Sequence, residues 1–266
     1  MFRNQYDTDI TTYSPQGRVH QIEYAMEAVK QGSAVVGLRS ATHVVLATLK
    51  RSSSELASNQ RKLFEIDSHV GIAIAGLTAD ARVLTRFMRA ECHNHQYVYE
   101  TPMPLSRLVL AVADKSQVAT QRASKRPFGV GLLVAGYDTT GAHLYQTCPS
   151  GNYFEYEAFA IGARSQSAKT YLEKHFESFA ALSLEELCRH AILALQETVA
   201  SSKDTELTTR NTALAFVGRD TPWTMVEDDS VEEYLLVLDA EDELEEGDAD
   251  AARQQPQQPP AAMDES

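Results

Sequence analysis

The sequence is poor in cysteine, and no short motif places its cysteines for pairing or for metal binding. Only Cys92, Cys148 and Cys188 occur among the 266 residues, and no two of them form a CxxC pair. An odd number of cysteines without a signal-peptide pattern is typical of a reducing compartment. The sequence therefore predicts a protein of the cytoplasm and nucleus.

Long hydrophobic runs are also missing from the sequence. The longest apolar stretches, such as Val70–Leu77 and Val130–Ala135, are far shorter than the ~20 residues that a membrane-spanning helix needs. We therefore expect no membrane segment. A single domain of this length would bury ~70–75% of its unfolded surface, so a substantial core is available.

Basic residues are scarce at the C-terminal end. From Val226 to Ser266 the chain has fifteen Asp or Glu residues and one basic residue, Arg253, whereas acidic and basic residues nearly balance elsewhere. A strongly acidic segment with few apolar residues cannot offset the entropy of ordering, and it does not neutralise phosphates. We therefore expect a disordered tail at residues 239–266 and no binding of nucleic acid.

Apolar residues at regular spacing predict strands in two groups, separated by pairs of helices. A tight turn at Ser14–Gly17 precedes a short amphipathic helix that ends at Gly32. Its apolar face is formed by Ile22, Ala25, Met26 and Val29. Strands are expected at residues 34–38, 44–49, 70–75, 129–137, 143–147, 153–161, 211–217 and 223–226, and further helices around residues 81–88, 105–112, 165–176 and 184–198.

Bunched strands and paired helices favour stacked layers over βαβ winding. We predict an α+β fold, a four-layer αββα sandwich in which helices cover the outer face of each of two facing sheets. An ordinary α+β domain could produce the same string of elements. The expected organisation is an N-terminal arm at residues 1–17, one domain at residues 18–238 and the acidic tail at residues 239–266.

Several motifs occur in a fixed order near the N-terminus. They are S-P-x-G-R at Ser14–Arg18, Q-x-E-Y-A at Gln21–Ala25 and V-V-L-A at Val44–Ala47. The segments GLTADAR, RPFGVGLL and IGARSQSAKTYLE continue the pattern to about Leu238. The sequence thereby resembles the α subunits of the 20S proteasome, and the segments QIEYAMEAVKQGSA and QTCPSGNYFEY resemble the type-1 branch of that family more than its sister types.

This resemblance implies the αββα sandwich of the N-terminal-nucleophile hydrolases and a structural role in ubiquitin-dependent protein degradation. The implied partners are six other α subunits in a heteroheptameric ring, the β subunits of the inner ring, and regulatory complexes such as the 19S particle. No cofactor is implied.

The resemblance also implies that the chain has no catalytic residue. Related β subunits use an N-terminal threonine whose own amine acts as the base. The corresponding position here is near Ser33, whose nitrogen is a peptide amide because a helix and an arm precede it. The position of the supporting carboxylate falls at the apolar residue Leu49, and Lys62 alone cannot perform the reaction.

Cys92, His93 and His95 offer soft and imidazole ligands, but they do not have the spacing of a metal site. On a helix His93 and His95 diverge by about 200°, and no second cluster completes four ligands. We interpret this segment as a helix end with solvated histidines and predict no bound metal.

In the α-subunit family, residues at the positions of Tyr6, Asp7, Pro15 and Tyr24 are associated with ordering the N-terminal arms when the axial pore opens. Pro15 would fix the direction of the arm, and Asp7 would accept a hydrogen bond from a tyrosine hydroxyl across a subunit boundary. The alternative is that these residues only tie down the chain terminus. Thr8 stands where many family members have an arginine, which removes a charge-assisted contact.

Lys62 matches a family lysine that lines a pocket between adjacent α subunits and receives the C-terminal carboxylate of activator subunits. A compact ammonium group suits the capture of a chain terminus. The alternative is a solvated lysine beside Arg61.

Two other classes of function stay open at this point. An active N-terminal-nucleophile hydrolase would require cleavage that exposes a Thr, Ser or Cys. A free-standing binding module would leave the ring surfaces unused.

Overall fold

A computed structural model of the chain describes residues 6–51, 56–58, 60–199 and 207–236. The predicted acidic tail and the first five residues of the predicted arm lie outside the described residues. Among the helices within these ranges, none is both long and apolar enough to cross a membrane.

Ten strands of the described chain form two antiparallel sheets of five strands each. The first sheet has the order β10-β9-β2-β1-β8, with β1 at Val35–Arg39, β2 at His43–Leu49, β8 at Ala158–Ile161, β9 at Thr212–Gly218 and β10 at Thr221–Glu227. The second has the order β3-β4-β5-β6-β7, with β3 at Leu63–Asp67, β4 at Val70–Gly76, β5 at Val130–Asp138, β6 at Gly141–Thr147 and β7 at Tyr153–Glu155.

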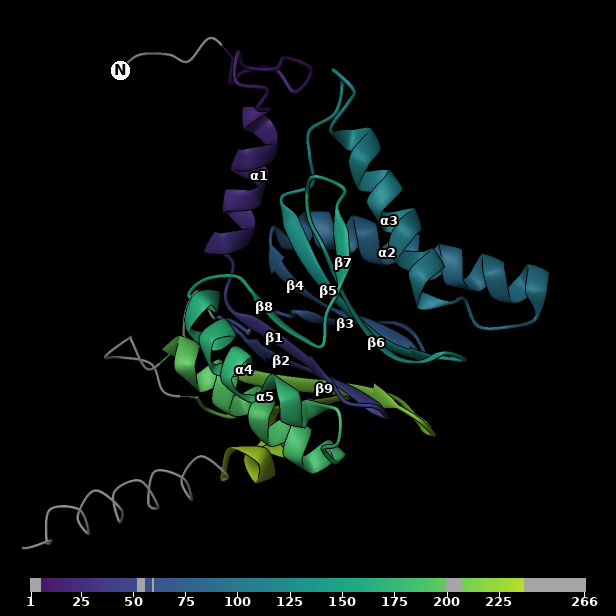
Figure 1. The fold of residues 1–266 in the computed structure, drawn as a ribbon, viewed down its shortest axis with the longest axis vertical. Coiled ribbons are helices and arrows are strands. Elements are labelled where there is room, and N and C mark those ends of the chain that lie inside the picture. Colours follow the sequence, from purple (N-terminus) through teal and green to yellow (C-terminus); the bar gives the residue numbers. More distant parts are fainter. Residues whose placement is uncertain (1–5, 52–55, 59, 200–206, 237–266) are drawn as a thin grey trace, which may run out of the picture.

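Helices cover the outer face of each sheet (Figure 1). The second sheet is covered by α2 (Thr78–Tyr99) and α3 (Leu105–Ala119), and the first sheet by α4 (Ser165–Phe179) and α5 (Leu184–Val199). A short 3-10 helix, η1 (Asp228–Val231), follows β10. The predicted four-layer αββα sandwich is therefore confirmed.

The central strands are apolar on both faces because both faces are buried. Along β2, Val44 and Leu46 point into the core between the sheets, whereas Val45 and Ala47 pack beneath the helices of the first sheet. Side chains of the second sheet such as Leu133 complete the core between the sheets.

The strand β3 was not predicted from the sequence. Leu63 faces the core between the sheets, whereas Phe64 and Ile66 pack toward α2 and α3, and Glu65 is exposed. The register of pairing with β4 shifts between Glu65 and Asp67. Five residues that include two carboxylates and have apolar side chains on both faces do not show the alternation by which strands are recognised.

The prediction of one strand at residues 153–161 is wrong, because this segment changes sheets. Its first part, β7, pairs with β6 in the second sheet, and its last part, β8, pairs with β1 in the first sheet. The chain crosses between sheets at Tyr156 and Glu157, whose backbone groups bond to Leu144 and Arg39 respectively. The local sequence does not reveal such a crossing, because the sheet that each half joins depends on the strand with which it pairs.

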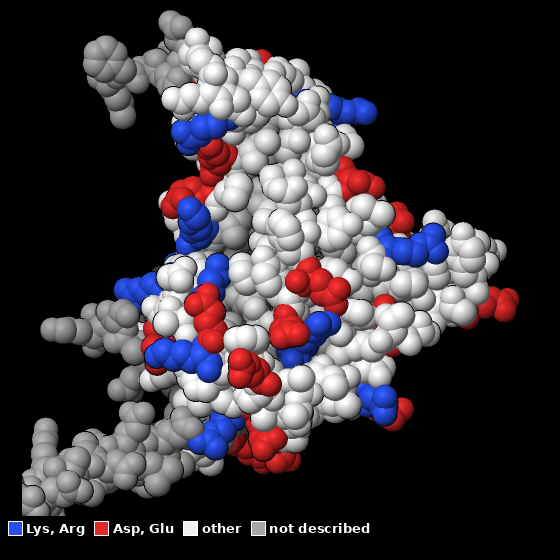
Figure 2. Space-filling view, in the orientation of Figure 1, with Lys and Arg blue, Asp and Glu red and all other residues white. Residues whose placement is uncertain are grey.

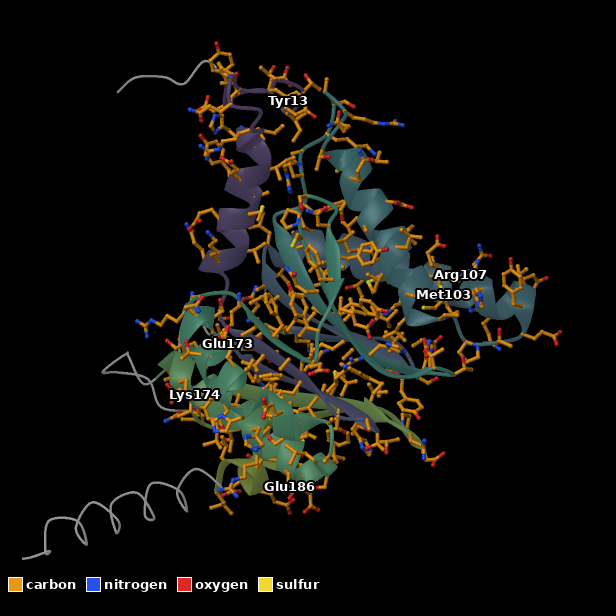
Figure 3. The ribbon with its side chains drawn as sticks, viewed as in Figure 1. Tyr13, Met103, Arg107, Glu173, Lys174 and Glu186 are labelled. Carbon is orange, nitrogen blue, oxygen red and sulfur yellow. The ribbon has the colours of Figure 1, made fainter. Side chains whose placement is uncertain are left out.

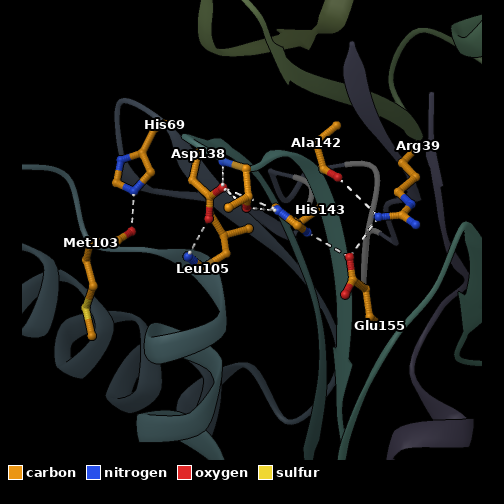
Figure 4. Close-up of polar contacts among 9 residues, drawn as sticks. Arg39, His69, Met103, Leu105, Asp138, Ala142, His143 and Glu155 are labelled. Atoms are coloured by element: carbon orange, nitrogen blue, oxygen red, sulfur yellow. Dashed lines mark hydrogen bonds and ion pairs between the residues drawn. The ribbon is translucent and has the colours of Figure 1, made fainter. Parts of the chain in front are cut away.

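A polar network ties the two sheets together at one end of the sandwich (Figure 4). Arg39, at the end of β1, donates to Glu155 Oε1 over 2.7 Å, and His143 Nδ1 lies 2.7 Å from the same oxygen. Asp138 Oδ2 accepts the Leu105 amide at the start of α3 over 3.2 Å. Burial raises the pKa of the Asp138 carboxyl, but the hydrogen bonds it accepts outweigh burial and hold this pKa below its usual value.

The opposite end of the sandwich is covered by α1 (His20–Gln31), which rises from the sheets toward the arm (Figure 1). Val29, near the end of α1, inserts into the core between the sheets, and a Cβ added at Gly131 would lie 2.8 Å from its Cγ1. The helix ends at Gly32 as predicted. The first part of α1 and the arm therefore stand above the sandwich.

Candidate functional site

The predicted tight turn shapes the N-terminal arm. The Gly17 amide donates to the Ser14 carbonyl over 2.8 Å, with Pro15 at the second position of the turn and Gly17 at φ 75°. Proline presets its own φ, and glycine tolerates the left-handed region, so the sequence specifies this turn. The Ser14 Oγ also accepts the Arg18 amide over 3.1 Å, which directs the chain into α1.

Two of the four predicted gate residues come together where the arm meets α1. The Tyr24 hydroxyl lies 3.4 Å from Asp7 Oδ2, and the Gln21 side chain donates to the Asp7 carbonyl. Desolvation and the Asp7 carboxylate raise the pKa of the Tyr24 phenol. Tyr24 is half exposed and faces the arm. This bond lies within one chain, and a bond across a subunit boundary stays a prediction.

Pro15 and Tyr6 are the other two predicted gate residues. Pro15 is exposed in the turn, and Tyr6 is partly exposed at the start of the described chain. Thr8 is exposed. Asp9 acts locally, because its carboxylate accepts the Thr11 amide over 3.0 Å, and this bond together with that of the Thr11 hydroxyl lowers the pKa of Asp9.

Sequence reasoning missed two anchors of the arm. The Gln121 side chain donates to the Tyr13 hydroxyl over 3.4 Å, which connects the arm to the loop after α3; Figure 3 shows Tyr13 near the start of α1. Arg18 forms two hydrogen bonds to the Glu23 carboxylate, of 2.6 and 2.7 Å. No local pattern signals the first contact, since 108 residues separate the partners. The contact between Arg18 and Glu23 could have been predicted, because Glu23 is an acidic residue in the first turn of α1 and Arg18 precedes that helix.

Lys62 lies beneath the end of α1, against the start of β1. Its ammonium donates to the Ser33 carbonyl over 2.5 Å, to Ser33 Oγ over 2.7 Å and to the Ala34 carbonyl over 3.1 Å. The residue is only 3% exposed, so the alternative of a solvated lysine is wrong for this chain. Burial, with a smaller contribution from Arg51, places the pKa of Lys62 well below its usual value.

We expect Lys62 to make stability depend on pH. The unfolded chain binds more protons than the folded chain between the lowered folded pKa and the ordinary lysine pKa, so stability rises with pH across this window. Lys62→Met should remove this slope and also cost about 1–3 kcal/mol, because three oxygen atoms lose their donor. Urea unfolding at several pH values measures both effects. A slope that survives in the variant would contradict this assignment, and Lys174→Met, at an exposed lysine, is the matched control.

Ser33 and Lys62 are arranged like a hydroxyl nucleophile beside a basic side chain. The surroundings of Ser33, however, do not favour catalysis. Ser33 is 5% exposed, and its nitrogen is the amide that follows Gly32. The Ala163 amide donates to the Gly32 carbonyl over 2.6 Å, and a Cβ at Gly162 would lie 2.5 Å from the Ser33 carbonyl oxygen. The chain thus packs directly against the position where a nucleophile would act.

Comparisons with known proteins decide which family this arrangement belongs to. Residues 29–215, more than half of the chain, match the sequence profile described as "Proteasome subunit". Residues 6–28, which contain the described part of the arm and most of α1, match the profile of the N-terminal signature of A-type proteasome subunits. The chain belongs to the proteasome α-subunit family.

Individual relatives agree over nearly the whole chain. The alpha type-1 proteasome subunit of Dictyostelium discoideum is 59% identical over 92% of this chain and 98% of its own length. The protein of the same name from Drosophila melanogaster is 47% identical over 98% of this chain and 95% of its own length. A probable alpha type-6 proteasome subunit of Schizosaccharomyces pombe is 48% identical over 98% of this chain and 95% of its own length. The predicted resemblance to α subunits, and to type-1 in particular, is confirmed.

Membership of the proteasome α-subunit family establishes the coarse role of the chain. It is a structural α subunit of the 20S particle, which acts in protein degradation, and it assembles with other proteasome subunits. Subunits of the α type are generally non-catalytic.

Cys92, His93 and His95, which the sequence offered as possible metal ligands, lie on α2. Cys92 is buried in the core beneath α2, and burial raises the pKa of its thiol to about 12. His93 is exposed, whereas His95 is buried and its Nδ1 lies 3.0 Å from the Thr101 carbonyl. The prediction of solvated histidines is therefore wrong for His95. The described part of the chain holds no group of three His, Cys, Asp or Glu residues suited to a metal ion.

Proposed function

We propose that this proteasome α subunit is a non-catalytic member of a heteroheptameric outer ring, where it contributes to a gated substrate pore and to the docking of activators in ubiquitin-dependent degradation. Six other α subunits, the β subunits of the inner ring and regulatory complexes such as the 19S particle are the proposed partners. The observation that carries the proposal is the continuous path of the chain from the arm through α1 to Ser33.

The same path supports the absence of catalysis. A threonine-type nucleophile needs a free amine at the first residue of the chain, and the Ser33 nitrogen is an amide at the end of a twelve-residue helix and its Gly32 cap. The neighbouring position Leu49 supplies only an apolar side chain and a backbone amide, which donates to the Ala34 carbonyl over 3.1 Å.

The surface of α1 supports assembly into a ring. Of the apolar stripe predicted on this helix, only Val29 is buried, whereas Met26 is 40% exposed and Ile22 is half buried. An apolar stripe that its own chain leaves uncovered fits a contact with another subunit. The bonds of Asp7 to Tyr24 and Gln21 would hold the arm over such a contact, at the proposed gate.

The environment of Lys62 supports a role in activator docking. Its ammonium contacts uncharged oxygens of Ser33 and Ala34 and has no carboxylate partner among the described residues. The C-terminal carboxylate of an activator would supply the missing charge and restore the ordinary protonation of the lysine. The flexible four-carbon stem would carry the ammonium toward it.

We also propose that the protein resides in the cytoplasm and nucleus. All three cysteines are free, and Cys92 and Cys188 are buried. Burial raises the pKa of each of these two thiols to about 12, which keeps them unreactive.

The proposal is tested on the native assembly. We expect the chain to elute in a particle much larger than 29.4 kDa, together with six sister α subunits and β subunits, and its intact mass to include the arm. A mass that begins at Ser33 would indicate an active hydrolase. Elution as a monomer would indicate a free-standing module. Either result overturns the ring assignment.

A further inference from the structure

A pocket of about 440 Å³ lies between α1 and α4, on the side of α1 that faces β8. Apolar side chains of Val29, Phe159 and Ile161 contribute to its lining. Basic side chains of Lys30, Arg164 and Lys169 also line it, and its lining has no acidic residue. We call it the α1–α4 pocket. An apolar floor with basic side chains favours a ligand that is partly apolar and carries a negative charge.

Lys169 is the most buried basic side chain of this pocket, since Lys30 and Arg164 are exposed. Its ammonium lies 4.1 Å from the centroid of the Phe159 ring, and within the described part of the chain it has no hydrogen bond or ion pair. Burial lowers the pKa of Lys169, although Glu173 partly opposes this effect. A cation that loses water without gaining a counter-charge is costly, unless another molecule supplies the charge.

The backbone at the start of α4 adds positive potential to the same pocket. Arg164 adopts φ 56°, in the left-handed region, and no side chain caps the helix that begins at Ser165. Arg164, Ser165 and Gln166 all line the pocket, so the positive end of a fifteen-residue helix borders it. Anions are favoured at such a helix end.

The α1–α4 pocket opens on a side of the sandwich that its own chain leaves uncovered. The strands β7 and β8 each form one edge of their sheet, and both edges lie on this side. Phe154, on β7, is 52% exposed, and Figure 2 shows a largely uncharged strip between α1 and α3. Exposed edge strands with aromatic side chains favour pairing with another chain.

A closed ring of similar subunits uses two different sides of each subunit, because each neighbour contact is heterologous. We propose that the α1–α4 pocket receives a segment of an adjacent α subunit in which an apolar side chain is followed by an acidic residue. The apolar side chain fills the floor, and the carboxylate pairs with Lys169 and Arg164. This inference rests on the proposed ring function and assigns one of its contact surfaces.

The first test labels amines in the assembled particle. A limiting acylating reagent should modify Lys169 at least about tenfold more slowly in the particle than in the isolated full-length chain, which corresponds to about 1.4 kcal/mol of protection. Lys174, exposed on the same helix (Figure 3), should react equally in both. Equal rates for Lys169 in the particle and the free chain would overturn the proposal.

The second test identifies the partner. A carbodiimide, which joins an amine directly to a carboxylate, should link Lys169 to an Asp or Glu that follows an apolar residue of an adjacent α subunit. Links only to a β subunit, to an activator or to Glu173 of the same chain would overturn the choice of partner. The composition of the particle is measured first, so a chain absent from the ring overturns the proposed function itself, whereas an unprotected Lys169 inside a ring overturns only this inference.

Competition between variants gives an independent readout. When wild type and Lys169→Met are coexpressed with the sister subunits, rings should contain several-fold less of the variant, Lys169→Arg should recover incorporation, and Lys174→Met should match wild type. Equal incorporation of Lys169→Met would contradict the pairing. The labelling test uses only wild-type protein, so it decides the matter even if Lys169→Met folds poorly.

Discussion

Replacing Gly32 with alanine is expected to destabilise the protein by about 3 kcal/mol or more and to prevent its incorporation into rings. The cause is lack of space where α1 meets the sandwich. A Cβ at Gly32 would lie 2.3 Å from the Gly76 nitrogen and 3.0 Å from the Ala75 carbonyl carbon. Both contacts are with backbone atoms of the last two residues of β4, so no side-chain rotation relieves the overlap.

The surroundings of Gly32 leave little freedom for adjustment. Gly76 has φ 115°, and a Cβ added there would meet the Gly129 carbonyl oxygen at 2.3 Å. On the other side, the Gly32 carbonyl accepts the Ala163 amide over 2.6 Å. Relief would therefore require the end of α1 to move away from β4, which withdraws Val29 from the core between the sheets and displaces the arm.

Thermal unfolding of the purified chain measures the effect, and a midpoint lowered by about 6 °C or more is expected for a domain of this size. The matched control is Gly17→Ala. Gly17 has φ 75° but no atom within 4 Å of its added Cβ, so only the conformational cost of about 1 kcal/mol applies. Equal losses of thermal stability in the two variants would contradict the explanation that Gly32 is needed for the close approach of α1 to β4.

The sequence predicted the layers of the fold because burial leaves a repeating local pattern. Runs such as Val44–Ala47 are apolar at every position, as expected for a strand covered on both faces. The turn at Ser14–Gly17 and the end of α1 at Gly32 were predictable for a similar reason. Proline narrows the range of backbone angles at its position, and glycine widens it. These features depend on residues close together in the chain.

Features that depend on distant residues were not predictable in the same way. The division of residues 153–161 between two sheets follows from pairing with β6 on one side and β1 on the other. The contacts of Lys62 with Ser33 and of Tyr13 with Gln121 join residues 29 and 108 positions apart. No local spacing encodes such contacts, although the resemblance to a family drew attention to Lys62.

The candidate gate was identified partly from the sequence and partly from contacts between distant residues. Asp7 and Tyr24 were singled out by their positions in the family motif, and the geometry of one chain brings them to 3.4 Å. A half-exposed hydrogen bond of this length contributes little to stability. Its consequence is positional, because it holds the arm at the start of α1 rather than strengthening the fold.

Deleting residues 1–12 from this chain alone is expected to raise hydrolysis of a small peptide by the otherwise intact particle several-fold. The deletion removes the arm up to Thr12 but keeps the turn at Ser14–Gly17 and the Arg18–Glu23 pair, so α1 should stay folded. If the arm occupies the pore, its loss widens the path for substrate without changing the catalytic β subunits. The expected change is therefore a higher rate, with the same dependence on peptide sequence.

Matched variants separate closure of the pore from disturbance of the ring. Native mass spectrometry must show a complete particle with the shortened chain, and Tyr24→Phe, which removes only the hydroxyl that contacts Asp7, should give a smaller rise than the deletion. An unchanged rate in a complete particle would mean that this chain is a ring scaffold and that its neighbours close the pore. That outcome would agree with the expectation, drawn from the family resemblance, that Thr8 leaves this arm with one charged contact fewer.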